Sequence, residues 1–312
     1  MMKIYKSNED GQLALCEKIE PGVWIDMVNP SSQDIHTIVE TLKLDADFIL
    51  AALDEEERPR IEIENEGQGL IVVDFPMLPD EDDYIYETMP LGIVFCESAF
   101  ITVCLKENPV LRMFSENRVK GFYTQYKSRS ILQMLYKNAV LFLQYLRQIE
   151  KHSSRVESEL HKSMKNKELI ELLGLEKSLV YFSTSLKSND LVMEKLLRNS
   201  FFKKYPEDKD LLDDTLIENK QAIEMAKIYS DILAGTMDAF ASVISNNLNI
   251  VMKLLTSITI VMAIPTMISG FFGMNVPIPF LAQNPWAFSL IFGATTVICG
   301  VVALVMGKKK MF

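Results

Sequence analysis

The sequence lacks ionisable residues over one long stretch near its C-terminus. Residues 254–307 contain no Asp, Glu, Lys, Arg or His, and residues 251–312 contain four lysines and no acidic residue. Residues 1–250 therefore hold 28 of the 32 basic residues and all 42 acidic residues, which is a net charge of −14. An acidic body has no basic face of the kind that nucleic-acid binding requires. The composition indicates a membrane protein with an acidic soluble part and excludes a nucleic-acid partner.

Cysteine and histidine are scarce, and several chemical signatures are missing. The four cysteines show no C-x-x-C or other metal-ligand spacing, which is typical of free thiols in a reducing cytoplasm. His36, His152 and His161 lie in charged surroundings without a spaced partner, so we expect no metal or catalytic role for them. Because no nucleotide-binding glycine loop or nucleophile elbow occurs, we expect neither an enzyme nor an ATP-driven pump. Charged residues near Met1 interrupt any apolar run, so no signal peptide is expected.

Two uncharged, mostly apolar segments, residues 254–272 and 286–307, are each long enough to cross a bilayer as a helix, which takes about 20 residues. The three prolines of residues 273–285 predict a turn between them. A buried hairpin of a soluble fold is the alternative, but it would need helices that are apolar on every face. Lys253 and residues 308–310 flank the spans, so both termini are expected in the cytoplasm and the protein in the cytoplasmic membrane.

The rest of the chain predicts an α+β cytoplasmic domain and then helices. Runs rich in β-forming residues occupy Val23–Val28, 70–75, 91–96 and 99–105. Pro30, Ser31 and Asp34 predict a capped helix that ends near Lys43. From about residue 130, apolar positions spaced by three and four up to residue 160 predict a helix with a narrow coiled-coil-like seam, and a second helix follows over 175–197.

A third helix is predicted from Pro206 without a break to Phe272, because residues 207–264 contain no proline. At 1.5 Å per residue it would be about 100 Å long and would join the soluble part to the membrane. The predicted divisions are an α/β domain (1–128), a helical hairpin (129–206), a stalk helix with the first transmembrane helix (207–272), an extracytoplasmic loop (273–285), a second transmembrane helix (286–307) and a basic cytoplasmic tail (308–312).

One face of this long helix is small or polar at heptad spacing, while the rest is apolar. The residues are Asp238, Ser242, Ser245, Asn249, Met252, Thr256, Thr259, Ala263, Thr266, Gly270 and Gly273. Tight helix–helix packing accounts for small residues and hydroxyls in a span. A pore wall shared by several copies accounts for them too, because polar side chains in a span face protein or water rather than lipid. The residues alone leave both interpretations open.

The tripeptide Gly273-Met274-Asn275 ends the first span, and Pro265 and Thr266 lie ten and nine residues before Asn275. With a second span and a basic C-terminus after it, this arrangement resembles the signature of the CorA-type magnesium transporter family, a group of two-span G-x-N membrane proteins. Residues 24–26, 52–60 and 166–187 also resemble the soluble domain of that family. The resemblance covers essentially the whole chain.

The resemblance implies a homopentameric funnel whose selectivity filter is Gly273, Met274 and Asn275 and which conducts Mg²⁺ passively, with Mg²⁺ as the transported and regulatory ion and no organic cofactor. Counted from Asn275, the family's pore positions fall on Asp238, Asn249, Met252, Leu255, Ala263 and Thr266, with Thr259 on the same face. Met252 and Leu255 would form an apolar constriction. From the residues alone, Asn275 could equally be a helix C-cap, and Asp238 an ordinary solvated residue.

The resemblance also implies that Asp213 and Asp214 bind cytoplasmic Mg²⁺ between neighbouring subunits and so close the pore. Acidic residues that complement the helix dipole are the alternative. The partner carboxylate stays open, and the acidic loop at residues 80–83 is one candidate.

The sequence departs from the family around the motif. Phe272 stands where tyrosine is usual, Val276 where phenylalanine is usual, and the external loop carries no acidic residue. The altered loop therefore leaves transport of Zn²⁺, Co²⁺ or Ni²⁺ open as an alternative. A membrane-anchored sensor or scaffold is an alternative from another class, and the polar face and the G-M-N motif count against it.

Overall fold

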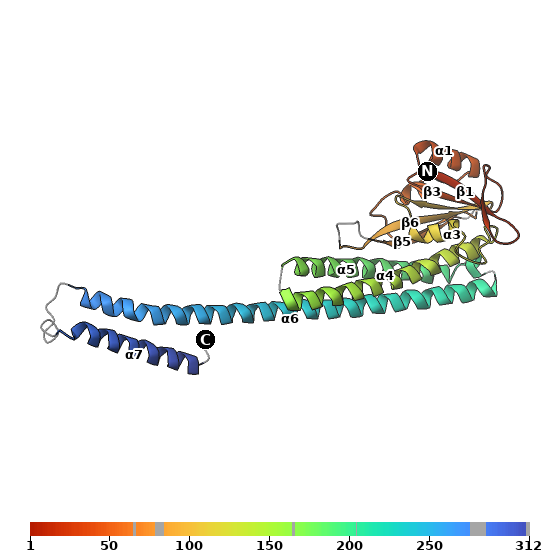
Figure 1. Cartoon of the computed structure of the whole chain (residues 1–312). Helices are drawn as coiled ribbons and strands as arrows, with labels where there is room; N and C mark the ends of the chain where they lie inside the picture. Colours follow the sequence, from red (N-terminus) through yellow and green to blue (C-terminus); the bar gives the residue numbers. More distant parts are fainter. Residues whose placement is uncertain (65–66, 79–83, 164–165, 204, 275–284, 310–312) are drawn as a thin grey trace. The chain divides into compact units, whose positions relative to one another are not determined.

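The computed structural model in Figure 1 describes the chain except residues 65–66, 79–83, 164–165, 204, 275–284 and 310–312. It divides into two compact units, Met1–Gly235 and Thr236–Phe312. The first unit holds a β-sheet with its covering helices, and the second holds two apolar helices. Helix α6 (Pro206–Phe272) contributes residues to both units. The six-part division made from the sequence stays a prediction.

The first unit is built on a sheet with the strand order β2-β1-β3-β7-β6-β5-β4. The pair β3–β7 is parallel, and the other neighbours are antiparallel. The strands are β1 (Met2–Ser7), β2 (Leu13–Leu15), β3 (Val23–Val28), β4 (Arg60–Ile63), β5 (Gly69–Met77), β6 (Glu87–Phe95) and β7 (Ala99–Cys104). The four predicted strands are confirmed as β3, β5, β6 and β7. The other three were not predicted, because they are short or carry charged residues.

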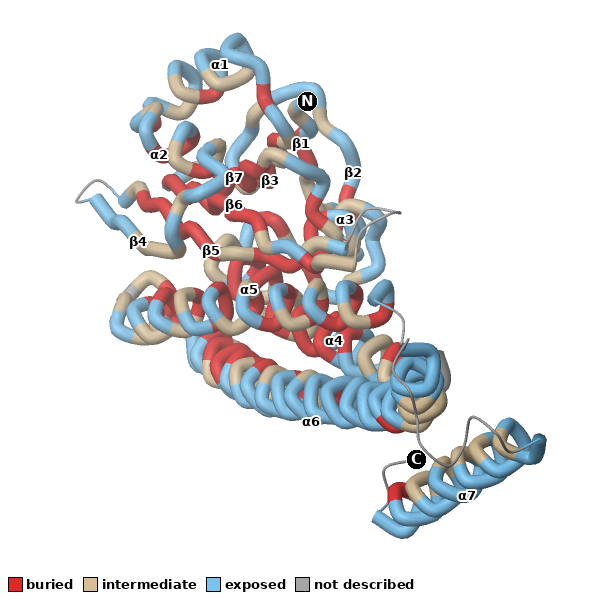
Figure 2. Tube along the Cα trace, turned by 90° about the vertical axis from the view of Figure 1, so that its left-hand side faces the viewer, coloured by how far each residue is buried: buried red, intermediate tan, exposed pale blue. Residues whose placement is uncertain are grey.

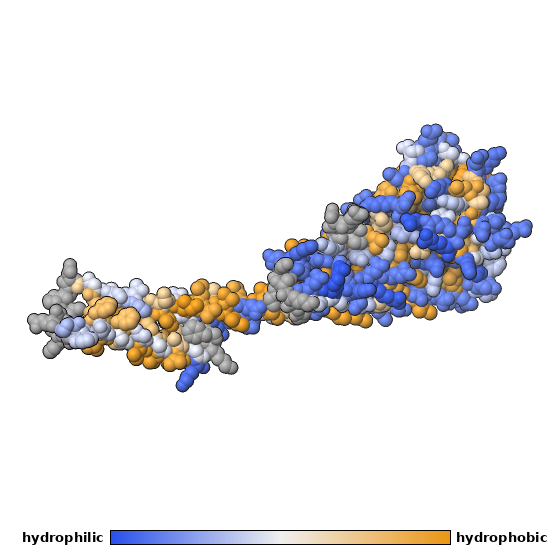
Figure 3. All heavy atoms as spheres, in the orientation of Figure 1, coloured by the Kyte–Doolittle hydropathy of each residue, from blue (hydrophilic) through white to orange (hydrophobic). Residues whose placement is uncertain are grey.

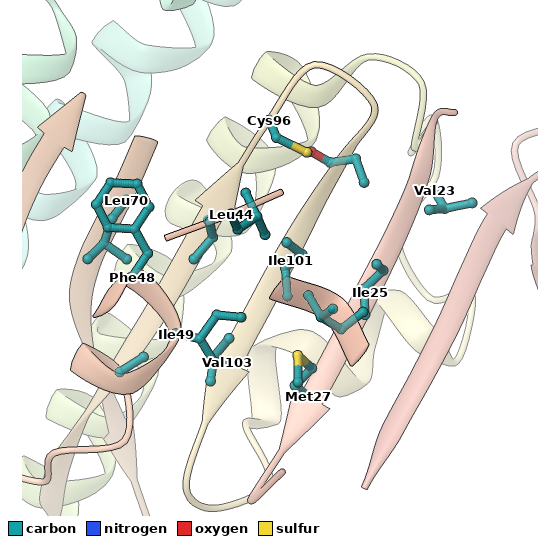
Figure 4. Close-up of a cluster of buried hydrophobic side chains, with 14 of the residues drawn as sticks. Val23, Ile25, Met27, Leu44, Phe48, Ile49, Leu70, Cys96, Ile101 and Val103 are labelled. Atoms are coloured by element: carbon teal, nitrogen blue, oxygen red, sulfur yellow. The ribbon is translucent and has the colours of Figure 1, made fainter. Parts of the chain in front are cut away.

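Successive side chains along the central strands point to opposite faces of this sheet. Ile25 and Met27 of β3 and Ile101 of β7 belong to a buried cluster under α1 (Ser32–Leu42) and α2 (Ala46–Ala51), which Figure 4 shows. Trp24 and Phe100, from the alternate positions, stack on the opposite face with ring centroids 6.3 Å apart. Both faces are therefore covered, which explains why these strands are apolar at nearly every position.

Helix α1 has the predicted cap. The Ser31 hydroxyl accepts a hydrogen bond from the Asp34 amide, and Asp34 accepts one from the Ser31 amide, which completes a capping box. Lys43 ends the helix in the left-handed conformation, at the predicted position. The segment after α2 lies so close to β6 that a Cβ on Gly92 would be 2.4 Å from the Cβ of Ala52, so only glycine fits there.

Helices cover the other face of the sheet, as Figure 2 shows. They are α3 (Pro109–Ser115), α4 (Lys127–Ser163), α5 (Asn166–Leu196) and the short 3-10 helix η1 (Ser200–Lys203). The first part of α6 packs on α5, where Nδ2 of Asn219 donates to the Leu186 carbonyl at 3.1 Å. The nine seam positions that the spacing predicts for α4 are 132, 135, 139, 142, 146, 149, 153, 156 and 160. Eight of them are buried, and Ser153 is half-buried. The prediction of a narrow seam was wrong, because Ile131, Met134 and Leu141 are buried as well. Helix α4 contacts both the sheet and α5, so a wider face is apolar.

Two asparagines join the helices to strand β5 at Asp74. The Asp74 amide donates to Oδ1 of Asn189 at 2.8 Å, and Nδ2 of Asn189 donates to the Asp74 carbonyl at 2.8 Å. Nδ2 of Asn138 on α4 donates to the same carbonyl at 2.7 Å. On this side of β5 the neighbouring strand β4 pairs only as far as Val72, so the backbone groups of Asp74 have no strand partner there. Buried side-chain amides thus replace part of the sheet ladder.

We expect Asn189→Ala to lower the free energy of unfolding by about 2 kcal/mol, because the buried Asp74 amide loses its partner, whereas the Asp74 carbonyl keeps Asn138. Asn138→Ala is the matched control and should cost about 1 kcal/mol, because Asn189 still satisfies the carbonyl. Urea unfolding of the full chain in detergent measures both values. Equal losses in the two variants would contradict these roles of Asn189 and Asn138.

Candidate ion pathway

The C-terminal part of α6 and helix α7 (Ala287–Lys308) are long and apolar enough to cross a membrane. Almost no side chain in their most apolar windows is buried inside the chain. Figure 3 shows the corresponding apolar surface over the second unit. Both helices agree with the predicted spans to within one residue at each printed end. Surface of this kind is stable in lipid or against other copies of the chain, and it is unfavourable in water.

One face of α6 lies toward α7. Ser257 is fully buried, and Val261, Ile264, Pro265 and Ile268 are half-buried, whereas the residues between them are exposed. The matching residues of α7 recur mostly every third or fourth position and are Ala287, Ile291, Thr295, Cys299, Val302, Ala303 and Met306. Sequence analysis did not identify these two sets, although this spacing on α7 is a visible signal for them.

The predicted pore positions lie on the other side of α6. Asp238, Asn249, Met252, Leu255, Thr259, Ala263, Thr266 and Gly273 are all exposed. At about 100° per residue, their face is centred nearly opposite the face that lies toward α7. Packing against α7 therefore does not account for the small and polar residues on this face. The face is free for contact with another chain or with water.

The hydroxyls on this face are partly satisfied by their own helix. Thr259 donates to the Leu255 carbonyl at 2.8 Å, and Thr266 donates to the Met262 carbonyl at 3.2 Å. Each hydroxyl has thereby used its only hydrogen, and its oxygen lone pairs remain as acceptors. An acceptor of this kind suits the water molecules around a hydrated cation. Met252 and Leu255 add an apolar segment to the same face.

The C-terminal end of α6 leads into the Gly273-Met274-Asn275 motif. The Gly273 amide donates to the Ser269 carbonyl at 2.9 Å, which continues the helical hydrogen bonding for one residue past Phe272. A Cβ on Gly273 would be 3.1 Å from that carbonyl oxygen, so a larger residue would crowd this turn. Met274 is exposed. Asn275 lies outside the described residues.

The predicted regulatory pair lies on the part of α6 that belongs to the first unit. Asp214 is exposed and Asp213 is half-buried. Exposed Ile217 follows Asp214 by one helical turn, and Ile228 and Ile232 continue this exposed apolar face. The candidate partner loop, residues 80–83, lies outside the described residues. Among the described residues, no group of three His, Cys, Asp or Glu side chains could hold a metal ion.

His152 contacts a carboxylate that its position in the sequence did not indicate. Its Nε2 lies within hydrogen-bonding distance of Oε1 of Glu171, which joins α4 to α5, and its ring lies edge-on to that of Tyr84 with the centroids 6.0 Å apart. His152 and Glu171 are 19 positions apart in the sequence and meet because α4 and α5 are antiparallel neighbours. His36 lies four residues before Glu40 on α1 and is exposed. The His152 contacts join α4 to α5 within the first unit.

Asp26 of β3 is an ionisable residue that lines a cavity of about 440 Å³ in the first unit. The indole of Trp24 donates to the Thr102 hydroxyl, which donates to Asp26 at 2.9 Å. Burial raises the pKa of Asp26 to about 6, and the Thr102 hydrogen bond and Lys3 oppose that rise. Glu107 adds to it by repulsion. The Asp26 carboxyl therefore changes its charge near pH 6.

Asp26 therefore predicts a defined dependence of stability on pH. The folded chain retains the Asp26 proton up to about pH 6, whereas the unfolded chain loses it near pH 4, so this contribution to stability is lost as the pH rises through 6. We expect Asp26→Asn to raise the free energy of unfolding by at most about 3 kcal/mol at pH 8 and by almost nothing at pH 4. Thermal unfolding of the full chain in detergent measures the difference. An equal effect at both pH values would contradict the assignment.

Known proteins resemble this chain over most of its length. The model of the CorA-like Mg²⁺ transporter protein family matches residues 20–309. The cobalt/magnesium transport protein CorA of Methanocaldococcus jannaschii is 28% identical over 291 residues, which are 88% of this chain and 87% of that protein. The solved structure of the complete CorA magnesium transporter from the same organism has a TM-score of 0.83 at 25% identity and covers 98% of this chain and 96% of that one.

A more distant similarity concerns the soluble part. The cytoplasmic domain of ZntB from Vibrio parahaemolyticus matches with a TM-score of 0.60 at 12% identity, over 78% of this chain and 96% of that one. At this identity the match shows a shared fold only. The predicted class, an α+β domain followed by a long helix and two C-terminal apolar helices, is confirmed.

Proposed function

Because the chain belongs to the CorA-like Mg²⁺ transporter family, and is thus a divalent-cation transporter of the membrane, we propose that it is a passive, homopentameric Mg²⁺ channel. The observation that carries this proposal is the exposed face of α6 that lies opposite α7. Small, hydroxyl and amide side chains follow it from Asp238 to the Gly273-Met274-Asn275 motif. Polar groups in a span need protein or water beside them, and a shared pore supplies both.

Self-assembly follows from the same geometry. One chain has two membrane helices, which cannot enclose a channel, so several copies of α6 must surround it. The first unit also exposes apolar side chains on α6, namely Ile217, Ile228 and Ile232, each at least 53% exposed. A second copy would remove this surface from water. Five copies would place five Asn275 side chains around one mouth.

Ion passage would combine weak coordination with an apolar gate. Mg²⁺ releases its water reluctantly, so amide oxygens of Asn275 and carbonyls of Gly273 would bind the hydrated ion through hydrogen bonds. Met252 and Leu255 would close the pathway by narrowing and dewetting. Asp238 would raise the local cation concentration at the inner mouth. By the positive-inside rule, Lys253 and residues 308–310 support a topology with both termini in the cytoplasm.

Asp213 and Asp214 would make the channel responsive to cytoplasmic Mg²⁺. The ion would link them to carboxylates of the neighbouring subunit, and its removal would leave repelling acids that favour the open state. We expect the double substitution of Asp213→Ala and Asp214→Ala to abolish the inhibition of Mg²⁺ entry by high Mg²⁺ on the cytoplasmic side. The rate of entry under that condition should rise about tenfold, which corresponds to about 1.4 kcal/mol of lost coupling.

The control for this prediction is Asp231→Ala, which removes an exposed acid about 25 Å further along the same helix. It should leave the inhibition unchanged. Entry rates of the double variant that still fall as strongly at high internal Mg²⁺ would contradict the regulatory role.

Transport of Zn²⁺ or another transition metal is the second candidate, because the loop after the motif carries no acidic residue. Proteoliposomes that contain the full chain and an internal dye for each metal distinguish the two. Entry of Mg²⁺ above that of Zn²⁺, Co²⁺ and Ni²⁺ at equal concentration supports the proposal. Entry of Zn²⁺ without Mg²⁺ replaces it with the second candidate.

A further inference from the structure

Pro265 leaves one backbone carbonyl of α6 without its helical partner. In an α-helix the amide of residue 265 would donate to the carbonyl of Val261, but proline has no amide hydrogen. Helix α6 nevertheless continues through this position to Phe272. A carbonyl inside a membrane has no water to replace the lost bond, so a nearby donor should stabilise it.

The structure provides a donor from the other helix. Sγ of Cys299 on α7 lies 3.8 Å from the carbonyl oxygen of Val261. Cys299 and Val261 are both half-buried and belong to the two faces that lie toward each other. A thiol is a weak donor, and sulfur contacts are longer than those of nitrogen or oxygen. The contact joins the two membrane helices at the carbonyl that the proline has freed.

The position of this contact between the helices is distinctive. Toward the loop, a groove of about 540 Å³ separates α6 from α7, and Val261, Pro265 and Cys299 are among its lining residues. On the other side of the contact, Ser257 of α6 and Met306 of α7 are buried. The contact therefore lies where close packing gives way to the groove. Ala263 and Thr266 of the predicted pore face lie within five residues of Val261 on the same helix.

We propose that Cys299 is a positioning residue of the transport pathway. Its thiol donates to the Val261 carbonyl that Pro265 leaves free, and the bond holds the pore-lining part of α6 in register with α7. This inference rests on the proposed function, because the register matters only if α6 lines the pathway. It explains why a helix interrupted by proline keeps a defined position beside a groove.

A double-mutant cycle in the full chain tests the bond. Cys299→Ala should lower the rate of Mg²⁺ entry into proteoliposomes and change the unfolding equilibrium constant about threefold, the usual effect of one interhelical hydrogen bond. Cys299→Ser retains a donor and should restore both values. In a Pro265→Ala background the Val261 carbonyl regains an amide donor, so adding Cys299→Ala should change neither value further. Equal effects of Cys299→Ala in both backgrounds, or no rescue by serine, would overturn the inference.

An infrared measurement separates this inference from the proposed function. The S–H stretching band of Cys299 is obtained as the difference between the spectra of the unaltered chain and the Cys299→Ala chain. We expect this band at lower frequency with Pro265 present than in the Pro265→Ala background, because the thiol donates only to the freed carbonyl. An unshifted band overturns the bond whether or not the chain transports Mg²⁺. A shifted band in a chain without Mg²⁺ entry supports the bond and overturns the proposed function instead.

Discussion

Asn275→Ala is expected to reduce Mg²⁺ entry into proteoliposomes about 100-fold. In a pentamer the substitution removes five amide oxygens from one mouth, and each contributes a hydrogen bond of about 1 kcal/mol to the hydrated ion. A loss of about 2.7 kcal/mol in the stabilisation of the passing ion already corresponds to 100-fold in rate. An internal Mg²⁺ dye follows the entry, and equal protein content of the vesicles is verified for each variant.

Asn284, in the same loop region of the sequence, provides the control for that prediction. Asn284→Ala changes the same type of side chain outside the motif and should leave the entry rate within about twofold. Equal losses in the two variants would point to a general disturbance of the loop. An undiminished rate in Asn275→Ala would contradict the filter.

Leu255→Ala is expected to raise Mg²⁺ entry about tenfold at high cytoplasmic Mg²⁺, when the channel is closed. The smaller side chain widens the apolar constriction and makes it easier to hydrate, and about 1.4 kcal/mol off the barrier gives this change. Initial rates of dye response, with Mg²⁺ fixed on the cytoplasmic side, measure it. The prediction depends on Leu255 facing the pathway, as its 58% exposure in the single chain allows.

Leu254 provides a matched control, because it is the adjacent leucine and is also exposed, at 42%. It lies about 100° away around α6, on the side nearer α7. Leu254→Ala removes the same atoms and should leave closed-state entry unchanged. A similar rise in both variants would mean that loosened packing, and not a wider constriction, lets the ion through.

The elements predicted best from the sequence are those that depend on local pattern. The unbroken helix from Pro206 to Phe272 followed from the absence of interior breakers before Pro265, and the second span from an uncharged run. The cap of α1 followed from Ser31 and Asp34. Each of these signals is contained in a short window, so no tertiary contact had to be known.

The features that escaped prediction depend on contacts between distant segments. The wide buried face of α4 exists because a sheet and a helix both contact it, and the His152–Glu171 pair forms only when α4 and α5 lie antiparallel. The hydrogen bonds between Asn189 and Asp74 join residues that are 115 positions apart. The pore face was predicted from heptad spacing and family resemblance, and its role stays a prediction.

The most direct test of the central claim is Mg²⁺ entry into liposomes that contain only the purified full chain. The account predicts entry well above that of protein-free liposomes, driven by the Mg²⁺ gradient alone without nucleotide. Absence of entry for Mg²⁺ and for the transition metals, with the protein folded and inserted, would contradict a channel and leave a membrane-anchored sensor or scaffold as the function of this chain.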